Sequence, residues 1–299
     1  VIVTLRYGAQ FALIPNPRDV EFMCAQMKAR PPTRLAAVPS LFQMLVDTPA
    51  FKEVDFSKLK IASSGAAPLS SGDRHNIEAI IGAGKISDVF GMTETGPVHV
   101  CNPPGRSVPS SVGIPVPGAD TRIVDLETGT QEMPFGEPGE IITSGPQVMK
   151  GYLNLPEESA NSLRQWRDKT WMYTGDVGYM DEEGYIYLCD RAKDMLIVGG
   201  FKVFSVEVED KMQSMDQIAM TALIGQPDTN RPGNDIVHLY VEPTVTAKAL
   251  DKAELEADIL AFCREHMAPY KVPKVIHIID AIPLTAVGKI DKKALRATA

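Results

Sequence analysis

The stretch Asp88–Pro97 contains residue types that bind nucleotides. The aromatic ring of Phe90 can stack on a base, and the hydroxyl of Thr93 can donate a hydrogen bond to a phosphate oxygen. The carboxylate of Glu94 can hold Mg²⁺, a cation that prefers oxygen ligands. Taken alone, the stretch is equally well explained as an exposed loop, so the chemistry needs support from the rest of the chain.

The stretch Ser63–Leu69 is rich in small residues. Small side chains let a flat ligand lie against the backbone, which is one use of glycine close to a ligand. The simpler interpretation is a tight turn between a strand and a helix, and the stretch by itself favours that interpretation.

One carboxylate and one lysine mark two further stretches. In Tyr173–Asp176 the carboxylate of Asp176, if it sits on a tight turn, can accept hydrogen bonds from both hydroxyls of a ribose. Gly-Asp turns are common, so this signal is weak by itself. In Pro283–Ile290 the side chain of Lys289 is either a clamp for an anion or a solvated charge, and the solvated charge is the simpler interpretation.

Strands and helices alternate over the first 89 residues, which favours a mainly parallel sheet covered by helices. Apolar spacing predicts a helix over Leu35–Val46, interrupted by a proline. A short strand is expected over Lys60–Ser64, running into the small-residue stretch. A second helix is expected over Gly72–Ile81, because Gly82-Ala83-Gly84 follows it.

Later segments have different patterns. Over residues 105–189, short β-rich runs alternate with turns, which is typical of a small barrel or a distorted antiparallel sheet. After Asp190 a hairpin is expected around Gly199-Gly200. Apolar residues from Leu255 to His266 recur at helical spacing, and Asp251 can cap that helix. Strands are expected over Met220–Ile224, Ile236–Val241 and Val275–Ile279.

The predicted fold class is therefore α/β, in two domains. A length of 299 residues fits that number at roughly 150 residues per domain. Residues 1–189 form part of a large domain, with a β-rich subdomain at about 105–189. Residues 190–299 form a small α+β domain.

Composition limits the classes of function. A net charge of −8 argues against nucleic acid as the main partner, because phosphate binding needs a basic face. No run approaches about 18 apolar residues, so we expect no transmembrane segment. The four cysteines form no CxxC pair and the five histidines no metal-spaced cluster, so we expect no zinc site and reduced thiols in the cytoplasm.

Together and in this order, the four stretches resemble the adenylate-forming superfamily of acyl-CoA synthetases, firefly luciferase and peptide-synthetase adenylation domains. The resemblance runs from the first residues to the last, and its set of motifs is highly specific. It is strongest to bacterial long-chain fatty-acid–CoA ligases, which share the character of five further segments: Asn16–Asp19, Asp55–Ser57, Gly145–Met149, Asp181–Gly184 and Tyr270–Lys274.

The resemblance implies a nucleotide site. In it Phe90 stacks on the adenine, Asp88 lies at the adenine edge, and Asp176 binds the ribose hydroxyls. Thr93 would bind phosphate and Glu94 would bind Mg²⁺. The full set of implied nucleotide-binding residues is Gly65, Ala66, Ala67, Asp88, Val89, Phe90, Gly91, Met92, Thr93, Asp176, Arg191 and Lys289.

The resemblance also implies catalytic and mobile parts. Lys289, Thr93 and Glu94 would be the catalytic residues. Lys289 would bridge the incoming carboxylate and the α-phosphate, and its positive charge would stabilise the transition state. The small domain would swivel at Lys193. The pantetheine arm of coenzyme A would pass the segment Gly199, Gly200 and Phe201.

The implied activity is that of a fatty acid–CoA ligase. ATP and a fatty acid give acyl-AMP and pyrophosphate, and coenzyme A then gives acyl-CoA and AMP, with Mg²⁺ as the metal. An aryl- or medium-chain-acid–CoA ligase of the same fold and a non-catalytic fragment are the alternatives. Two residues depart from the family pattern: Ser205 replaces a usual proline, and Ile197 replaces a second lysine of plant aryl-CoA ligases. The Ile197 departure argues mildly for fatty acyl substrates.

The chain begins at Val1 and lacks the Ser/Thr/Gly-rich phosphate loop that precedes these motifs in the family. We therefore expect it to be the carboxyl-terminal part of a longer enzyme and to be incomplete as a catalyst alone. Peripheral contact with a membrane and a homodimer are both compatible with the sequence.

Overall fold

The computed structural model describes residues 6–67, 69–103, 105–285 and 289–298, so Gly288 beside Lys289 lies outside the described residues. The chain divides into two compact units. The first consists of Val1–Ala119, Gly145–Met149 and Gly184–Ile186, and the second of Asp120–Ser144, Lys150–Glu183 and Tyr187–Ala299. Within the described ranges, no helix has both the length and the apolar character needed to cross a membrane.

The first unit is built on a five-stranded mixed sheet. β1 pairs with β2 and β2 with β3 in parallel, whereas β3–β4 and β4–β5 are antiparallel. The α/β class is confirmed, but the parallel part is limited to three strands. The strands in sheet order are β1 (Arg34–Ala37), β2 (Ile61–Ser64), β3 (Ile86–Gly91), β4 (Val98–Cys101) and β5 (Ile114–Pro115).

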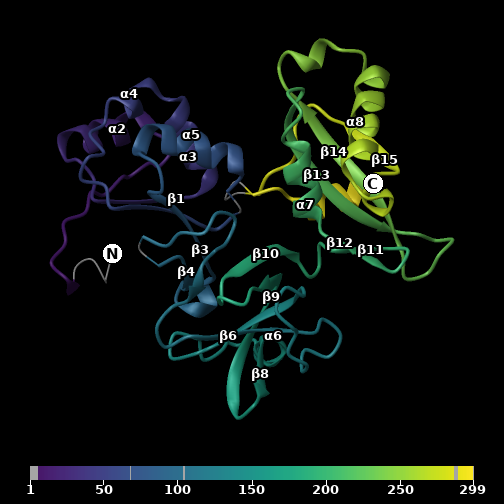
Figure 1. Cartoon of the computed structure of the whole chain (residues 1–299), viewed down its shortest axis with the longest axis horizontal. Coiled ribbons are helices and arrows are strands. Elements are labelled where there is room, and N and C mark those ends of the chain that lie inside the picture. Colours follow the sequence, from purple (N-terminus) through teal and green to yellow (C-terminus); the bar gives the residue numbers. More distant parts are fainter. Residues whose placement is uncertain (1–5, 68, 104, 286–288, 299) are drawn as a thin grey trace. The chain divides into compact units, whose positions relative to one another are not determined.

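Helices gather beside strands β1–β3 (Figure 1). They are α2 (Val20–Ala29), α3 (Pro39–Asp47), α4 (Pro49–Lys52) and α5 (Ser71–Ile81). The predicted helix over Gly72–Ile81 is confirmed as α5. It begins where the Ser70 hydroxyl accepts the Asp73 N–H, and it ends where Gly82 follows its last residue. The packed core between helices and strands includes the fully buried Phe42, Phe51 and Ile86.

The prediction of a single helix over Leu35–Val46 is wrong in its first part. Residues Arg34–Ala37 form strand β1, and α3 begins only at Pro39. A residue before proline avoids the helical region, and Val38 is extended with φ −85° and ψ 158°. Apolar spacing alone did not reveal this boundary.

The second unit contains a sheet of five antiparallel strands. Four of them lie in the order β10-β9-β7-β6, and β8 pairs with the other end of the long strand β9. The elements are β6 (Asp120–Val124), β7 (Gly139–Ser144), α6 (Pro156–Ser162), β8 (Leu163–Trp166), β9 (Lys169–Met180) and β10 (Ile186–Arg191).

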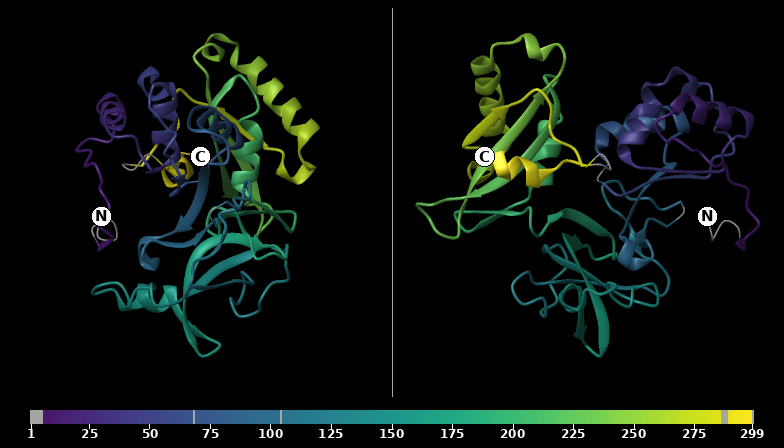
Figure 2. Two further views of the ribbon diagram at one scale, coloured as in Figure 1. Left: turned by 60° about the vertical axis from the view of Figure 1, so that its left-hand side comes forward. Right: turned by 180° about the vertical axis from the view of Figure 1, so that it is seen from behind.

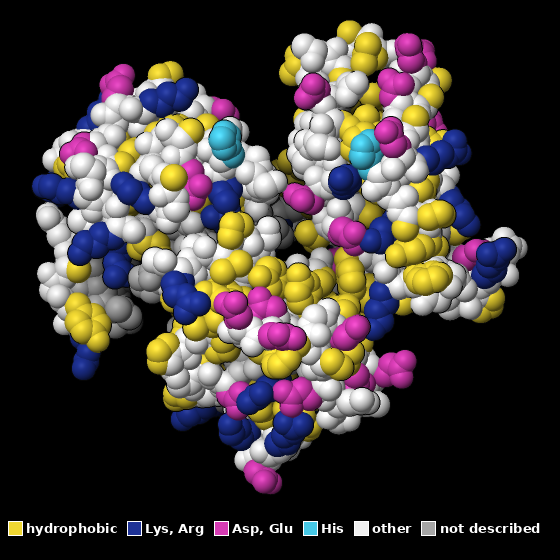
Figure 3. Space-filling model, viewed as in Figure 1, with side chains coloured by type: hydrophobic (Ala, Val, Ile, Leu, Met, Phe, Trp, Pro, Cys, Tyr) yellow, Lys and Arg dark blue, Asp and Glu magenta, His cyan; other side chains and the backbone are white. Residues whose placement is uncertain are grey.

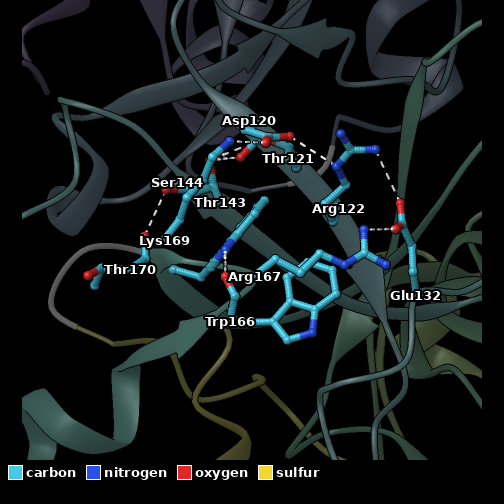
Figure 4. Close-up of polar contacts among 11 residues, drawn as sticks. Asp120, Thr121, Arg122, Glu132, Thr143, Ser144, Trp166, Arg167, Lys169 and Thr170 are labelled. Carbon is cyan, nitrogen blue, oxygen red and sulfur yellow. Dashed lines mark hydrogen bonds and ion pairs between the residues drawn. The ribbon is translucent and has the colours of Figure 1, made fainter.

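A network of ion pairs joins β6 to the β8–β9 hairpin (Figure 4). Asp120 pairs with Arg122 at 3.0 Å and with Lys169 at 2.7 Å. Glu132 pairs with Arg122 at 3.2 Å and with Arg167 at 2.7 Å. These side chains are between 29% and 58% exposed, so each pair contributes at most about 1 kcal/mol. The network therefore favours one geometry of the hairpin more than it adds to stability.

The rest of the second unit contains a three-stranded sheet with helices beside it (Figure 2) and a separate two-stranded sheet of β11 and β12. Its elements are β11 (Leu196–Val198), β12 (Phe201–Val203), α7 (Ser205–Met212), β13 (Ile218–Pro227), β14 (Asp235–Pro243), α8 (Lys252–His266), β15 (Val275–Ile278) and α9 (Lys292–Thr298). Short 3₁₀ helices are η1 (Thr93–Thr95) in the first unit and η2 (Ala247–Ala249) and η3 (Pro269–Lys271) in the second. The predicted strands and the helix capped by Asp251 are confirmed, since its carboxylate accepts from the N–H groups of Ala253 and Glu254.

Two hydrophobic clusters form on this sheet. One contains Leu239, Val241, Leu255 and Ile259, from β14 and α8. The other contains Ala222, Tyr240 and Leu295, from β13, β14 and α9. Because alternate residues of a strand face opposite sides, α8 and α9 cover opposite faces of the sheet. On the surface seen in Figure 3, acidic and basic side chains are interspersed.

Candidate active site

Two of the predicted stretches leave the same edge of the first sheet. Strands β2 and β3 are parallel neighbours, with Ser64 opposite Asp88. Gly65–Ala67 therefore follows β2 at the carboxyl edge where β3 leads into Gly91–Glu94. This edge is the usual place for ligands in open α/β sheets. Residues about twenty positions apart in the sequence are thus brought side by side.

The backbone at this edge is closely packed and locally strained. A Cβ atom added to Gly91 would lie 1.9 Å from the carbonyl oxygen of Pro97, so only glycine fits there. Ala66 has φ 70°, a left-handed conformation that is uncommon outside glycine. Ala66, Ala67 and Thr93 are exposed, whereas Glu94 is half-buried. At the surface, Ala66 and Ala67 therefore expose their backbone, and Thr93 exposes its hydroxyl.

The carboxylate of Asp88 is already paired. Arg74 of α5 forms an ion pair with it and also donates to the carbonyl of Ile86 at 2.9 Å. Burial raises the pKa of Asp88, and the Arg74 charge opposes that rise. Sequence reasoning missed Arg74, because a helix residue that reaches the next strand carries no local signal. An adenine-edge role for Asp88 stays a prediction.

Phe90 packs inside the first unit. Its side chain is 7% exposed, and its ring centroid lies 4.8 Å from that of His99 on β4. Neither ring nitrogen of His99 has a hydrogen-bond partner among the described residues, and burial lowers its pKa to about 4. Little of the Phe90 ring is open to a base here, so its stacking role stays a prediction.

Asp176 lies in a bulge of β9, and the predicted tight turn is wrong. Tyr173 pairs with Ile142 and Val177 pairs with Glu140, so β9 has two more residues than β7 between these pairs. The Asp176 N–H donates to the Thr174 hydroxyl at 3.1 Å. A bulge re-aims side chains within a strand, and here it sets the direction of the Asp176 carboxylate.

Glu140 supports this bulge from β7. Its carboxylate accepts the N–H of Gly175 at 3.0 Å, and Gly175 has φ 71°. Burial raises the pKa of Glu140, and the bond from Gly175 opposes that rise. Sequence analysis did not single out Glu140, since its partner is 35 positions away.

Asp176 stands close to two cations. The Nε atom of Arg191 lies 3.1 Å from its carboxylate, which is 15% exposed. Burial raises the pKa of Asp176, whereas Arg191 and then Lys289 lower it through their charges. Two further predicted residues, Arg191 and Lys289, therefore act on the charge of Asp176. One carboxylate with two cations suits a ligand that carries hydroxyls and phosphates.

The predicted hairpin around Gly199-Gly200 is confirmed. β11 and β12 are antiparallel, and the two glycines have φ 60° and 84°, as a two-residue turn of this kind requires. Phe201 is 57% exposed and stacks on Tyr270 with ring centroids 4.5 Å apart. An exposed aromatic ring beside a glycine turn can accept an extended ligand, but the pantetheine role stays a prediction.

Lys193 precedes this hairpin and has an exposed side chain. Its carbonyl oxygen accepts from Arg296 of α9 at 3.4 Å, and Arg296 pairs with Asp194 at 2.7 Å. The expected hinge is thus in contact with α9, and swivelling at Lys193 stays a prediction.

The donor groups at the first sheet's edge are compatible with Mg²⁺ bound through a substrate. Among the described residues, no three His, Cys, Asp or Glu side chains cluster as metal ligands. Mg²⁺ is usually held by one or two carboxylates together with substrate phosphates. Glu94, beside the Thr93 hydroxyl, therefore fits, and metal binding by Glu94 stays a prediction.

The predicted residues fall into two sets. Those from Gly65 to Glu94 belong to the first compact unit, whereas Asp176, Arg191, Lys193, Gly199–Phe201 and Lys289 belong to the second. The parallel pairing of β2 with β3 brings the residues of the first set together. In the second set, Asp176 is linked to Arg191 by an ion pair and to Lys289 by the effect of its charge.

Known proteins resemble this chain along nearly its whole length. The long-chain-fatty-acid–CoA ligase of Bacillus subtilis strain 168 is 38% identical over 293 residues, which cover 98% of this chain and 50% of that protein. The chain spans about half the length of the curated relatives it matches.

Solved structures agree with this similarity. ATP-bound MatB from Rhodopseudomonas palustris matches with a TM-score of 0.87 and 32% identity, over 99% of this chain and 56% of that one. A benzoate CoA ligase from Burkholderia xenovorans LB400 matches with a TM-score of 0.81 and 26% identity, over 98% of this chain and 57% of that one.

Two family models match separate parts of the chain. Residues 207–289 match the AMP-binding enzyme C-terminal domain. Residues 1–153, which are more than half of the chain, match the AMP-binding enzyme family. These matches agree with the parallel strands and with the two sets of site residues. The chain belongs to the AMP-binding enzyme family.

Proposed function

We propose that the protein carrying this chain is an ATP-dependent fatty acid–CoA ligase. In the first half-reaction, a carboxylate oxygen attacks the α-phosphorus of ATP, which gives acyl-AMP and pyrophosphate. In the second, the thiol of coenzyme A loses its proton and attacks the acyl carbon, a C–S bond forms and AMP leaves. AMP is needed because an unmodified carboxylate oxygen is a poor leaving group.

The observation that carries this proposal is the ion pair between Asp176 and Arg191, with Lys289 close enough for its charge to lower the pKa of Asp176. The Asp176 carboxylate is an acceptor for the ribose hydroxyls, and Arg191 holds it in place at 3.1 Å. The exposed ammonium group of Lys289 is then available for the incoming carboxylate and the α-phosphate. Fixed positive charge lowers the barrier because negative charge accumulates on the phosphate oxygens in the transition state.

In this proposal the first unit contributes its own nucleotide-binding residues at the carboxyl edge of β2 and β3. The backbone of Gly65–Ala67 lies along the adenylate, and Thr93 donates to a phosphate. Glu94 would hold Mg²⁺, which would neutralise phosphate charge when bound. Phe90 and Asp88 would face the adenine, and their present contacts with His99 and Arg74 would have to accommodate the base.

The two half-reactions need different surroundings for the same acyl group. Rotation at Lys193 would present Lys289 in the first and the Gly199–Phe201 turn in the second, which is a domain-closure mechanism. We propose residues 1–189 and 190–299 as the two parts that move.

A fatty acid is the acyl substrate that we favour. The name of the Bacillus subtilis relative states this substrate class. Ile197, where plant aryl-CoA ligases have a lysine, supports the same choice. An aryl acid is the second candidate, because the chain is also similar to a benzoate CoA ligase. The cytoplasm is the proposed place of action, where the four free cysteines would stay reduced.

A direct assay tests the proposal. The full-length protein carrying this chain is incubated with ATP, Mg²⁺ and coenzyme A, together with fatty acids of graded length or with benzoate. Chromatography of products should reveal acyl-CoA and AMP in equal amounts, with long-chain acids preferred. Preference for benzoate would select the second candidate. Absence of both thioester and AMP with every acid would contradict a CoA ligase.

A further inference from the structure

A buried charged network surrounds Lys292, the first residue of α9. Its ammonium group lies 2.8 Å from the carboxylate of Glu209 on α7 and donates to the hydroxyl of Ser205. The side chains of Lys292 and Glu209 are only 13% and 16% exposed. Asp190, Ser205, Glu209 and Lys292 are called the Lys292 network below.

Ser205 extends this network to the end of β10. It is fully buried, and its backbone N–H donates to Oδ2 of Asp190. The other oxygen of Asp190 accepts the N–H of Arg191 at 2.7 Å. Ser205 therefore connects α9, through Lys292, with the residue next to the candidate site residue Arg191.

One carboxylate oxygen of Glu209, Oε1, has two partners. Besides Lys292, it accepts the N–H of Leu223 on β13 at 2.7 Å. Burial raises the pKa of Glu209, and the charge of Lys292 opposes that rise. A buried ion pair holds its geometry because either charge alone would be costly in that environment. The start of α9 is therefore fixed to α7 and β13.

Lys289 precedes this anchor by three residues. Its N–H donates to the Thr285 hydroxyl at 3.1 Å, and its carbonyl accepts the Thr285 N–H at 2.7 Å. Leu284 and Ile290 form a bridge beside these bonds. The Lys289 side chain is exposed, whereas its backbone is tied to a loop that continues into α9. The Lys292 network, which fixes the start of α9, thus also limits the positions that the ammonium group of Lys289 can reach.

We infer that Lys292 and Ser205 are positioning residues that hold Lys289 for acyl-adenylate formation. The inference rests on the proposed function. It adds that the Lys292 network serves the first half-reaction specifically, because Lys289 acts only there. Asp190 lies before Lys193 in the sequence, and Ser205 lies after it. Rotation at Lys193 would therefore break the hydrogen bond between Asp190 and Ser205. The network would then be complete only in the arrangement that brings Lys289 towards Asp176.

Two substitutions at Lys292 test this role in the full-length protein. Lys292→Met should lower the rate of fatty-acid-dependent ATP–pyrophosphate exchange by roughly 10- to 100-fold, since a displacement of about 1 Å can cost about 100-fold. Thioester formation from preformed acyl-AMP and coenzyme A should stay within about threefold of wild type. Lys292→Arg keeps the charge and should restore much of the exchange. Lys293→Ala, on the exposed side of the same helix, is the matched control and should change neither rate.

Ser205→Pro keeps the test decisive if Lys292→Met fails to fold. Ser205 is the first residue of α7, a position that accepts proline, and Phe204 before it is extended with φ −89° and ψ 121°. Proline removes the N–H donated to Asp190 and the hydroxyl bound by Lys292. Exchange should fall by about tenfold. The variant should still unfold in one cooperative thermal transition, at a somewhat lower temperature because the buried Asp190 carboxylate loses a donor.

The outcomes separate this inference from the proposed function. Equal loss of both half-reactions in a folded variant, or unchanged exchange in both Lys292→Met and Ser205→Pro, would overturn the positioning role while leaving the ligase intact. A wild-type protein that catalyses neither half-reaction would refute the proposed function, and this inference with it.

Discussion

Arg191 and Asp176 form an ion pair in which the Nε atom of the arginine lies 3.1 Å from a carboxylate oxygen. They come from neighbouring strands β9 and β10, and Arg191 is 53% exposed whereas Asp176 is 15% exposed. The Asp176 carboxylate is therefore mostly buried and fixed by the ion pair, whereas the Arg191 guanidinium is exposed to solvent. A ligand can displace water from Arg191 without leaving Asp176 unpaired.

Replacing Lys289 by alanine should depress acyl-adenylate formation by about 100-fold or more, because a charge that stabilises the transition state is lost. Thioester formation from preformed acyl-AMP should be much less affected. ATP–pyrophosphate exchange measures the first rate, with Lys293→Ala as a control for loss of one exposed charge. Near-normal exchange by Lys289→Ala would disprove its role.

Asp176→Ala should weaken ATP binding by roughly 10- to 150-fold, the equivalent of one charge-assisted hydrogen bond. Folding should survive, because Arg191 is exposed enough to be solvated once its partner is gone. Titration calorimetry gives the affinity. Glu182→Ala removes an exposed carboxylate close in sequence and should bind ATP normally. Equal affinities for wild type and Asp176→Ala would rule out the ribose contact.

Arg74→Ala should destabilise the protein by about 3–5 kcal/mol, because it leaves the Asp88 carboxylate buried without its cation. The pKa of Asp88 should rise further without Arg74. A carboxyl whose folded pKa is raised loses stability as pH rises, so acidification should restore part of the loss. Urea unfolding at several pH values measures this, and Asp88→Asn in the same background should recover stability. A pH-independent loss would contradict the ion-pair explanation.

Acidification should destabilise the first unit through His99. Burial lowers the pKa of His99 to about 4, so the unfolded chain binds a proton first as pH falls from about 6.5. The stability lost on reaching pH 4 should be roughly 3 kcal/mol from this residue. His99→Leu removes the titrating ring, and its unfolding free energy should fall less over the same range. Parallel pH profiles for wild type and variant would exclude His99.

Residues 190–299 should fold without the rest of the chain. The larger hydrophobic cluster of this region contains only residues between Leu196 and Ile278, so its core needs no other segment. A cooperative thermal transition of the isolated segment, followed by circular dichroism, would support this. Residues 1–189 are the comparison and should lack such a transition. Gradual melting of residues 190–299 would contradict an independent domain.

Local signals in the sequence determined much of this protein. Ser70 and Asp251 start their helices by accepting backbone N–H groups a few residues ahead, and Gly199-Gly200 supplies the positive φ angles of a hairpin. Such effects act within a few residues, so they are readable from order and spacing alone. The motif residues from Gly65 to Lys289 were identified differently, because their roles were implied by the resemblance of the whole ordered set to the adenylate-forming superfamily.

Tertiary structure decided the pairings that give those residues their surroundings. The bulge that aims Asp176 depends on the register of β9 against β7. The partners of Asp88 and Glu209 are Arg74 and Lys292, and the second pair is 83 positions apart. Such contacts form because burial makes an unpaired charge costly, and which charges become buried together depends on how whole elements pack. No pattern within a single segment contains that information.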